Sequence, residues 1–224
     1  LNASPYESNK SAERDAMLLR QAQRFSLPIA YLNSVGGQDA LVFDGASMLV
    51  DRDGRSHAPA RAFADVLLEV DLDAEQGAFH AVTWPQDEDH SRAALNYAAL
   101  VRGTRDYVRK TGFSRVLLGL SGGIDSALTL AIAVDALGAA HVTAVRLPSR
   151  YTSDLSQDLA ATQAQTLGVR LLTLPIEAPF GGFLHTLQPL FAGRDSDLTE
   201  QNLQSRSRGA LLMALSNLEG APLL

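Results

Sequence analysis

Short apolar runs alternate with stretches of helical period through the second half of the chain. Val116 to Leu118 form a run without polar residues, which is typical of a parallel strand buried on both faces. The alternation predicts strands at 115–120, 141–147 and 169–174, separated by helices at 125–137 and 153–167. Another helix, at 89–110, is predicted to precede them and to end at Gly112. This order of elements predicts an α/β fold with a doubly wound parallel sheet, in which ligands bind beyond the carboxyl ends of the strands.

The N-terminal part of the chain has a different pattern, with one helix followed by short strand-like runs. Ser11 is expected to cap the helix, which runs to about Phe25. Glycine-containing turns separate predicted strands at 27–35, 41–43, 47–50 and 64–70. Periodicity is then lost from Asp71 to Gln86, which indicates a linker between two domains.

Composition and charge narrow the class of protein. The chain of 224 residues is 46% hydrophobic, which is ample for a packed core. Its net charge is −6, and it lacks the clustered basic residues that nucleic acid binding needs. The longest apolar stretch, 127–134, is far too short to cross a bilayer, and no secretory signal opens the chain. We therefore expect a cytoplasmic enzyme with no nucleic acid and no membrane partner.

The chain has no cysteine and only scattered histidines. Disulfides, cysteine-ligated zinc and thiol nucleophiles are thus excluded within these residues. The five histidines lack the spacing of metal ligands, so we interpret them as surface or packing residues. Because the chain begins without methionine and ends on the apolar segment 221–224, we expect it to be the central piece of a longer protein.

The segment between the first parallel strand and its helix has the features of a phosphate-binding loop. Gly122 and Gly123 let backbone N–H groups approach an oxyanion without a side chain in the way. The helix that begins near Asp125 directs its unpaired N–H groups and the positive end of its dipole at the same point. No lysine follows the glycines, so this is not the common P-loop. The alternative is an ordinary turn in which a serine or aspartate caps the helix.

The loop resembles the PP-loop of the ATP pyrophosphatase group, the adenine nucleotide α-hydrolase-like enzymes. This resemblance implies that the loop binds ATP and holds pyrophosphate as it leaves. Ser121 and Ser126 would hydrogen-bond phosphate, and Asp125 would supply an oxygen ligand for Mg²⁺. The turn at 148–153 follows the next strand, so we expect it to face the same pocket. The implied ATP-binding residues are Gly119, Leu120, Ser121, Gly122, Gly123, Ile124, Asp125 and Ser126.

Several other segments resemble one family within this group. Leu147 to Ser153 and Thr199 to Gly209 are similar to segments of NAD synthetases. The segments at 2–6, 35–39 and 42–47, together with Lys10, are similar to the late part of a nitrilase-type glutaminase domain. This order of domains resembles that of the glutamine-dependent NAD⁺ synthetase family. It implies the end of a nitrilase-like α-β-β-α sandwich at 1–72, a linker at 73–88 and part of a PP-loop synthetase domain at 89–224.

The family resemblance implies a ligase. ATP would adenylate the nicotinate carboxylate of deamido-NAD⁺, and ammonia from L-glutamine, or free ammonia, would then displace AMP to give NAD⁺. Ser4 and Lys10 would contact glutamine, whereas Asn202 and Arg206 would contact deamido-NAD⁺. The glutaminase Glu, Lys and Cys would lie before Leu1, so none of these catalytic residues is expected here. A homo-oligomer with the dinucleotide at its interface is expected by analogy.

Plainer interpretations stay open for each of these side chains. Ser4 can form a turn with the proline that follows it, and Lys10 can be a solvated charge. Arg206 and Arg208 can be surface charges on a helix.

The position of the turn after the second parallel strand makes Arg150 and Thr152 weaker candidates for nucleotide contacts. Two other functions are also open. One is another PP-loop amidotransferase, such as a GMP or asparagine synthetase. The other is a nitrilase-fold assembly module fused to a degenerate nucleotide domain.

Overall fold

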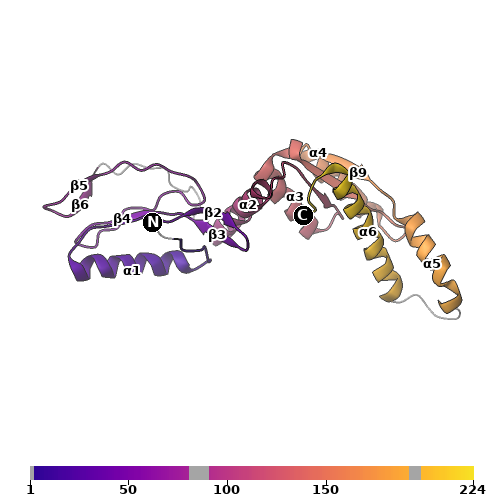
Figure 1. The fold of residues 1–224 in the computed structure, drawn as a ribbon, viewed down its shortest axis with the longest axis horizontal. Helices are drawn as coiled ribbons and strands as arrows, with labels where there is room; N and C mark the ends of the chain where they lie inside the picture. The colour runs from indigo at the N-terminus through magenta and orange to yellow at the C-terminus, as the bar shows by residue number, and fades with distance from the viewer. Residues whose placement is uncertain (1–2, 81–90, 192–197) are drawn as a thin grey trace. The chain divides into compact units, whose positions relative to one another are not determined.

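The computed structural model describes residues 3–80, 91–191 and 198–224 (Figure 1). Its contacts divide the chain into two units, Leu1–Tyr107 and Val108–Leu224. The division falls within helix α2 (Arg92–Lys110), and the predicted domain boundaries at 72 and 88 stay predictions. Within the described ranges, no helix is both long enough and apolar enough to cross a membrane.

The first unit combines helix α1 with three antiparallel strand pairs. Its elements are α1 (Lys10–Phe25), β1 (Ile29–Tyr31), β2 (Val35–Gln38), β3 (Leu41–Asp44), β4 (Met48–Val50), β5 (Asp71–Asp73), β6 (Ala78–His80) and most of α2. Strand β1 pairs with β4, β2 with β3, and β5 with β6. Leu18 and Ala22 of α1 pack against Tyr31, Met48 and Val50 of the β1–β4 pair, and Figure 1 shows α1 lying along β4. Burial of one helix stripe on a short sheet forms the core of this unit.

The structure corrects the sequence predictions for this unit at its helix start and at one strand. Helix α1 begins after Asn9, whose side chain makes no capping hydrogen bond, so the prediction that Ser11 caps it is wrong. The predicted strand at 64–70 is absent. Val66, Leu68 and Val70 instead pack against a small buried cluster. Their alternation therefore reflects one-sided burial without a partner strand.

Two further stretches of the first unit depart from the predicted pattern. The run predicted as one strand at 27–35 contains β1 and the first residue of β2, with an exposed Leu32 between them. The start of the predicted linker contains the β5–β6 hairpin, whose strands are each three residues long. Strands of this length contain too few residues to show the alternation of apolar and polar positions from which a strand is predicted. Residues 81–88 of the predicted linker, and the predicted helix start at Asp89, lie outside the described residues.

The second unit is a parallel α/β sheet, as predicted. Its elements are β7 (Val116–Gly119), α3 (Ile124–Leu137), a short 3₁₀ helix (Ala139–His141), β8 (Val142–Arg146), α4 (Asp154–Thr166), β9 (Arg170–Thr173), α5 (Glu177–Phe191) and α6 (Leu198–Glu219). The strands are parallel in the order β7-β8-β9. The predicted strands and helices between 115 and 174 are all confirmed, with ends within two residues. Helix α2 also ends as predicted, with Gly112 at a positive φ of 86°.

Both faces of the sheet are covered, which explains the uninterrupted apolar strand sequences. On β8, Val142 and Ala144 point to a core shared with α3 and α4. Val145, the next residue, points to the opposite core, where Leu211 and Leu215 of α6 contribute. Since neighbouring side chains on a strand point to opposite faces, the unit has three layers, helix on sheet on helix.

Strand β7 is paired along both of its edges. One edge bonds to β8. On the other edge, the Leu117 N–H donates to Pro222 O at 3.0 Å, and the Leu224 N–H donates to Leu117 O at 3.0 Å, in a parallel bridge centred on Leu223. The chain therefore adds strands on one side of β7 and then returns to its other side. This makes β7 the switch point of a doubly wound sheet, where such folds bind ligands.

Candidate functional site

The loop after β7 is held by hydrogen bonds among its own residues. The Ser126 hydroxyl accepts from the Ser121 N–H at 3.2 Å and donates to Gly123 O at 2.9 Å. The two hydroxyls of Ser121 and Ser126 lie 2.9 Å apart, and the Gly123 N–H donates to Ser121 Oγ at 3.2 Å. These hydrogen bonds fix the conformation of the loop from within.

Gly122 is the residue that allows this loop conformation. Its φ is +84°, a region that side chains of the L configuration rarely adopt. A Cβ on Gly122 would also lie 2.2 Å from the Ser156 carbonyl oxygen in α4. Gly123 faces no such constraint, because its φ is −86° and its Cβ would meet only Ser121 Oγ at 3.4 Å. Close approach of the loop to α4 therefore requires glycine at 122.

Helix α3 begins directly after the loop, at Ile124. The first N–H groups of a helix have no partner within the helix and carry the positive end of its dipole. Its N-cap is Gly123, which makes no side-chain cap, so these N–H groups stay available to an anion. Asp125 lies in the first turn with an exposed side chain. An exposed carboxylate is an oxygen ligand of the kind that Mg²⁺ takes in proteins.

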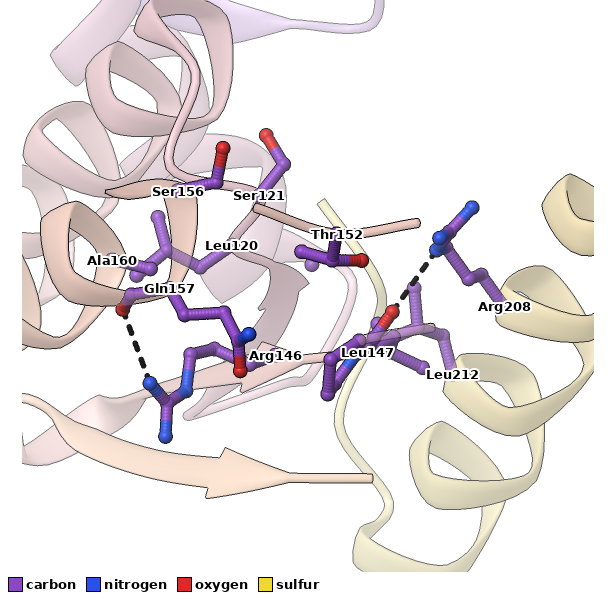
Figure 2. A pocket seen from close by; sticks show the side chains of 12 residues that line it. Leu120, Ser121, Arg146, Leu147, Thr152, Ser156, Gln157, Ala160, Arg208 and Leu212 are labelled. Carbon is purple, nitrogen blue, oxygen red and sulfur yellow. Dashed lines mark hydrogen bonds between the residues drawn. The ribbon is translucent and has the colours of Figure 1, made fainter. Parts of the chain in front are cut away.

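A pocket of about 290 Å³ lies between this loop and the residues that follow β8 (Figure 2). Ser121 comes from the β7 loop, Pro148 and Thr152 from the turn after β8, and Ser156 from α4. The prediction that the two loops face one pocket is therefore confirmed. The residues that line it are Gly119, Leu120, Ser121, Arg146, Leu147, Pro148, Thr152, Ser156, Gln157, Ala160, Arg208 and Leu212.

Two arginines on this pocket were not among the predicted site residues. Arg146, the last residue of β8, donates to Gln157 O at 3.1 Å and to Thr173 Oγ1 at 3.0 Å. Arg208 of α6 donates from Nε to Leu147 O at 3.1 Å, and burial lowers the pKa of this arginine. Figure 2 shows the two guanidinium groups on opposite sides of the pocket. Arg146 is held by the protein at all three guanidinium nitrogens, whereas Arg208 is held by the described residues only at Nε. Arg208 thus keeps both of its terminal NH₂ groups for an anionic or carbonyl ligand.

Of the two residues predicted as weaker candidates for nucleotide contacts, Thr152 lies at the pocket and Arg150 lies on the surface. Thr152 lines the pocket, and its hydroxyl accepts from the Ser149 N–H at 3.0 Å. Arg150 is exposed and forms an ion pair with Glu177, which raises the pKa of Arg150 and lowers that of Glu177 through a side-chain hydrogen bond. It is not among the residues that line the pocket.

Asn202 and Arg206 lie on an exposed face of α6, away from this pocket. Gln204, two residues from each, instead faces inward, where it accepts from the Ser149 hydroxyl at 3.0 Å. Two helix positions correspond to a rotation of about 200°, so Asn202 and Arg206 point to the opposite side. Any ligand of theirs must bind on that outer face.

A second hollow, of about 550 Å³, lies in the first unit. It brings Ser4 and Lys10 together, the two residues predicted to share a ligand. Glu13, Arg14 and Arg20 from α1 also line it, with further walls from Ala16, Met17 and Tyr31. Lys10 Nζ lies 3.3 Å from Glu7 Oε1 in an exposed pair. The hollow therefore carries both cationic and anionic side chains, as the zwitterionic end of an amino acid would require.

Arg14 is the most deeply placed charge in this hollow. It forms a bidentate pair with Asp44, at 3.1 Å and 2.7 Å. Burial acts to lower the pKa of Arg14, but the hydrogen bonds and charge of Asp44 outweigh it and raise the pKa overall. The guanidinium also lies 5.5 Å from the centre of the Tyr31 ring. Arg14 is thus permanently charged and fixed in place.

Comparisons with known proteins match this chain to one family. The family model described as NAD synthase matches residues 96–223. The chain is 60% identical to a glutamine-dependent NAD(+) synthetase of Xylella fastidiosa, over all of this chain and 41% of that protein. It is 46% identical to the corresponding synthetase of Acinetobacter baylyi, over 97% of this chain and 40% of that protein. The chain thus spans about two fifths of the length of these curated relatives.

A solved structure agrees with these sequence matches. A glutamine-dependent NAD⁺ synthetase from Acinetobacter baumannii, in complex with adenosine diphosphate, superposes with a TM-score of 0.92. The two are 45% identical, and the match covers all of this chain and 42% of the other. Both units of the present chain therefore have counterparts in one solved structure.

Proposed function

The chain belongs to the NAD synthase family, and on this premise we propose that the protein containing it is a ligase that amidates deamido-NAD⁺ to NAD⁺. ATP would activate the substrate, and glutamine or free ammonia would supply the nitrogen. The observation that carries this proposal is the pocket at the carboxyl end of β7, which is lined by the first residues of the loop, Gly119 to Ser121, and by two arginines. The glycines of the loop and the start of α3 follow directly in the chain. The pocket joins anion-binding groups to an apolar wall, as a nucleotide needs.

The first step would be adenylation at the β7 loop. A carboxylate oxygen of the nicotinate ring attacks the α-phosphorus of ATP, and pyrophosphate leaves. Backbone N–H groups of the loop and of the first turn of α3 would stabilise the charge that grows on the leaving phosphates. Arg146 and Arg208 offer further donors from the pocket walls. Ammonia then attacks the acyl carbon, AMP leaves, and the amide of NAD⁺ forms.

Asp125 would hold Mg²⁺ together with phosphate oxygens of the nucleotide. Its exposed carboxylate in the first turn of α3 fits this role, because Mg²⁺ usually binds one or two carboxylates and completes its shell with phosphate and water. When bound, the ion would neutralise charge on the phosphates. The loop residues Gly119 to Ser126 would contact the nucleotide around it.

Deamido-NAD⁺ would reach Asn202 and Arg206 only on the outer face of α6. We propose that a second copy of the protein covers this face, so that the dinucleotide is bound at the interface of a homo-oligomer. The exposure of both side chains supports this arrangement. A cytoplasmic location follows from the substrates of such a reaction.

Glutamine would bind in the hollow of the first unit, against Ser4 and Lys10. The Lys10 ammonium can pair with the α-carboxylate of glutamine, and the Ser4 hydroxyl can donate or accept one hydrogen bond. The glutaminase nucleophile would come from outside these residues, because the chain has no cysteine.

The test uses a protein of the relatives' full length that contains this chain. It is supplied with ATP, Mg²⁺ and deamido-NAD⁺, with either glutamine or ammonium as the nitrogen source, and its products are separated by chromatography. We expect NAD⁺ and AMP in equal amounts. Formation of ADP in place of AMP would contradict the adenylation step, and amidation of another nucleotide instead of deamido-NAD⁺ would favour a different PP-loop amidotransferase.

A further inference from the structure

Three polar side chains of the first unit form a buried network next to the hollow that Ser4 lines. Asn33, Asp44 and Arg14 have exposed fractions of only 6%, 4% and 6%. Buried polar groups are costly unless they are bonded, so a network of this kind is retained where it fixes a geometry. The network runs from Arg14, on the wall of the hollow, to Asn33, which bonds to the backbone of Ser4.

The Asn33 carboxamide holds the Ser4 backbone on both of its polar sides. The Ser4 N–H donates to Asn33 Oδ1 at 2.8 Å, and Asn33 Nδ2 donates back to Ser4 O at 3.1 Å. Pairing with β3 begins only beyond this residue, with the Pro5–Phe43 bridge and the hydrogen bond from the Tyr6 N–H to Val42 O. One side chain therefore substitutes for a strand partner at Ser4.

The orientation of the Asn33 amide follows from its second partner. Asn33 Nδ2 also donates to Asp44 Oδ1 at 2.9 Å. An ionised carboxylate can only accept, so the NH₂ group must face Asp44, and the oxygen must face the Ser4 N–H. Arg14 holds Asp44 by two hydrogen bonds. The Asn33 backbone N–H donates to Ser47 Oγ at 3.1 Å and fixes the residue from behind.

We propose that Asn33, oriented by the Asp44–Arg14 pair, is a positioning residue that holds Ser4 in place for glutamine. This inference rests on the proposed role of Ser4 as a glutamine contact. A serine hydroxyl makes one specific hydrogen bond only if its backbone is fixed, and Asn33 is the group that fixes it. The network should therefore act on glutamine binding and leave the reaction with free ammonia unaffected.

The main test variant is Asn33→Asp in a protein of the relatives' full length. The substitution keeps the size of the side chain but replaces the NH₂ donor by an oxygen, which then faces both Ser4 O and the Asp44 carboxylate. Steady-state kinetics are measured with glutamine and, separately, with ammonium. We expect the KM for glutamine to rise roughly 10- to 100-fold, as for the loss of hydrogen bonds to a charged group, with ammonia-driven kcat within about twofold of the parent.

Two other variants calibrate this result. Ser47→Ala removes only the acceptor behind Asn33, and it should raise the glutamine KM by less than Asn33→Asp does. Asp65→Asn is the matched control, since Asp65 is an 81% exposed partner of Arg102 in the same unit and does not line the hollow. Asp65→Asn should change neither the KM for glutamine nor the KM for ammonium.

Ser4→Ala, measured in parallel, distinguishes the proposed glutamine contact of Ser4 from the proposed positioning role of Asn33. If Ser4→Ala raises the glutamine KM and Asn33→Asp does not, the positioning role is wrong and the glutamine site stands. If neither raises it, the assignment of Ser4 fails and takes the inference with it. Equal losses with both nitrogen sources in Asn33→Asp would show a merely structural role. Should Asn33→Asp not fold, Ser47→Ala decides alone, with a glutamine-specific rise supporting the role and no change overturning it.

Discussion

The fold places different requirements on the two neighbouring glycines of the β7 loop, although they look equivalent in the sequence. Gly122 and Gly123 are adjacent and chemically identical. The fold needs glycine at 122 for both its backbone conformation and its approach to Ser156, whereas at 123 it needs neither. Substitution at each position can therefore separate the two demands on the loop.

Gly122→Ala should destabilise the protein much more than Gly123→Ala. An alanine at 122 meets both a positive φ and the Ser156 carbonyl oxygen, so we expect a loss of at least about 2 kcal/mol in the free energy of unfolding. At 123 the loss should stay below about 1 kcal/mol, the usual penalty for alanine at an N-cap. Urea denaturation followed by circular dichroism measures both. Equal losses would contradict the close packing of the loop on α4.

Asp125→Asn should impair NAD⁺ synthesis from glutamine and from ammonia alike. In the proposed reaction both nitrogen sources share the adenylation step, so losing the proposed Mg²⁺ ligand would remove several kcal/mol of charge stabilisation, or about 100-fold or more in kcat/KM. The assay is NAD⁺ formation with each source. Near-parental ammonia-driven synthesis in this variant would exclude the β7 loop as the adenylation site.

Some of the missed site residues had a signal in the sequence, and others had none. Arg208 lies three, four and seven residues before Leu211, Leu212 and Leu215, so helical spacing places it on their buried face. Arg206 lies off this stripe, which is why it is exposed. Asn33 offered no such signal, since its partners are distant in sequence and meet only in the folded unit.

At the scale of elements, prediction worked where both faces of a strand are buried. The runs of β7 and β8 are apolar because helices cover each side of the sheet, and their length distinguishes them from turns. It failed at 64–70, where alternation reflects packing on one side without a hydrogen-bonded partner. Strand pairing depends on residues that are distant in the sequence, so the local pattern of apolar positions cannot predict it.

Helix caps provide a second test at this scale. Ser153 caps α4 by accepting from the Ser156 N–H at 3.2 Å, whereas Asn9 at the start of α1 makes no side-chain cap. Ser153→Ala should therefore lower the free energy of unfolding by roughly 1 kcal/mol. Asn9→Ala is the matched control and should change it by less than about 0.5 kcal/mol. Thermal and urea denaturation of both variants check the difference, and a larger effect of Asn9→Ala would contradict the cap assignment.

At the scale of the whole molecule, the two proposed chemistries lie in separate units. The β7 pocket draws its walls from the second unit alone, and the hollow at Ser4 draws its walls from the first unit alone. The β7 pocket has residues of its loop and two arginines within this chain. The hollow at Ser4 has charged and polar side chains but no thiol.

The 224 residues by themselves should consequently not hydrolyse glutamine. No side chain in them can form the acyl-enzyme by the thiolate route. Glutamate release by the purified chain is measured by a coupled dehydrogenase assay, with a full-length protein as the positive control. Sustained release above the background without enzyme would show that our interpretation of the first unit is wrong.

The double pairing of β7 also sets an order of events during synthesis. Its partner on one edge, β8, follows closely in the chain, but residues 222–224 on the other edge come about a hundred residues later, so that edge closes at a high cost in loop entropy. At ribosomal rates this interval lasts roughly 5 to 20 seconds. Throughout it, the strand that carries the glycine loop presents an open edge, the kind of surface on which nascent chains pair wrongly. The centre of the finished sheet is therefore open to wrong pairing while the protein is being made.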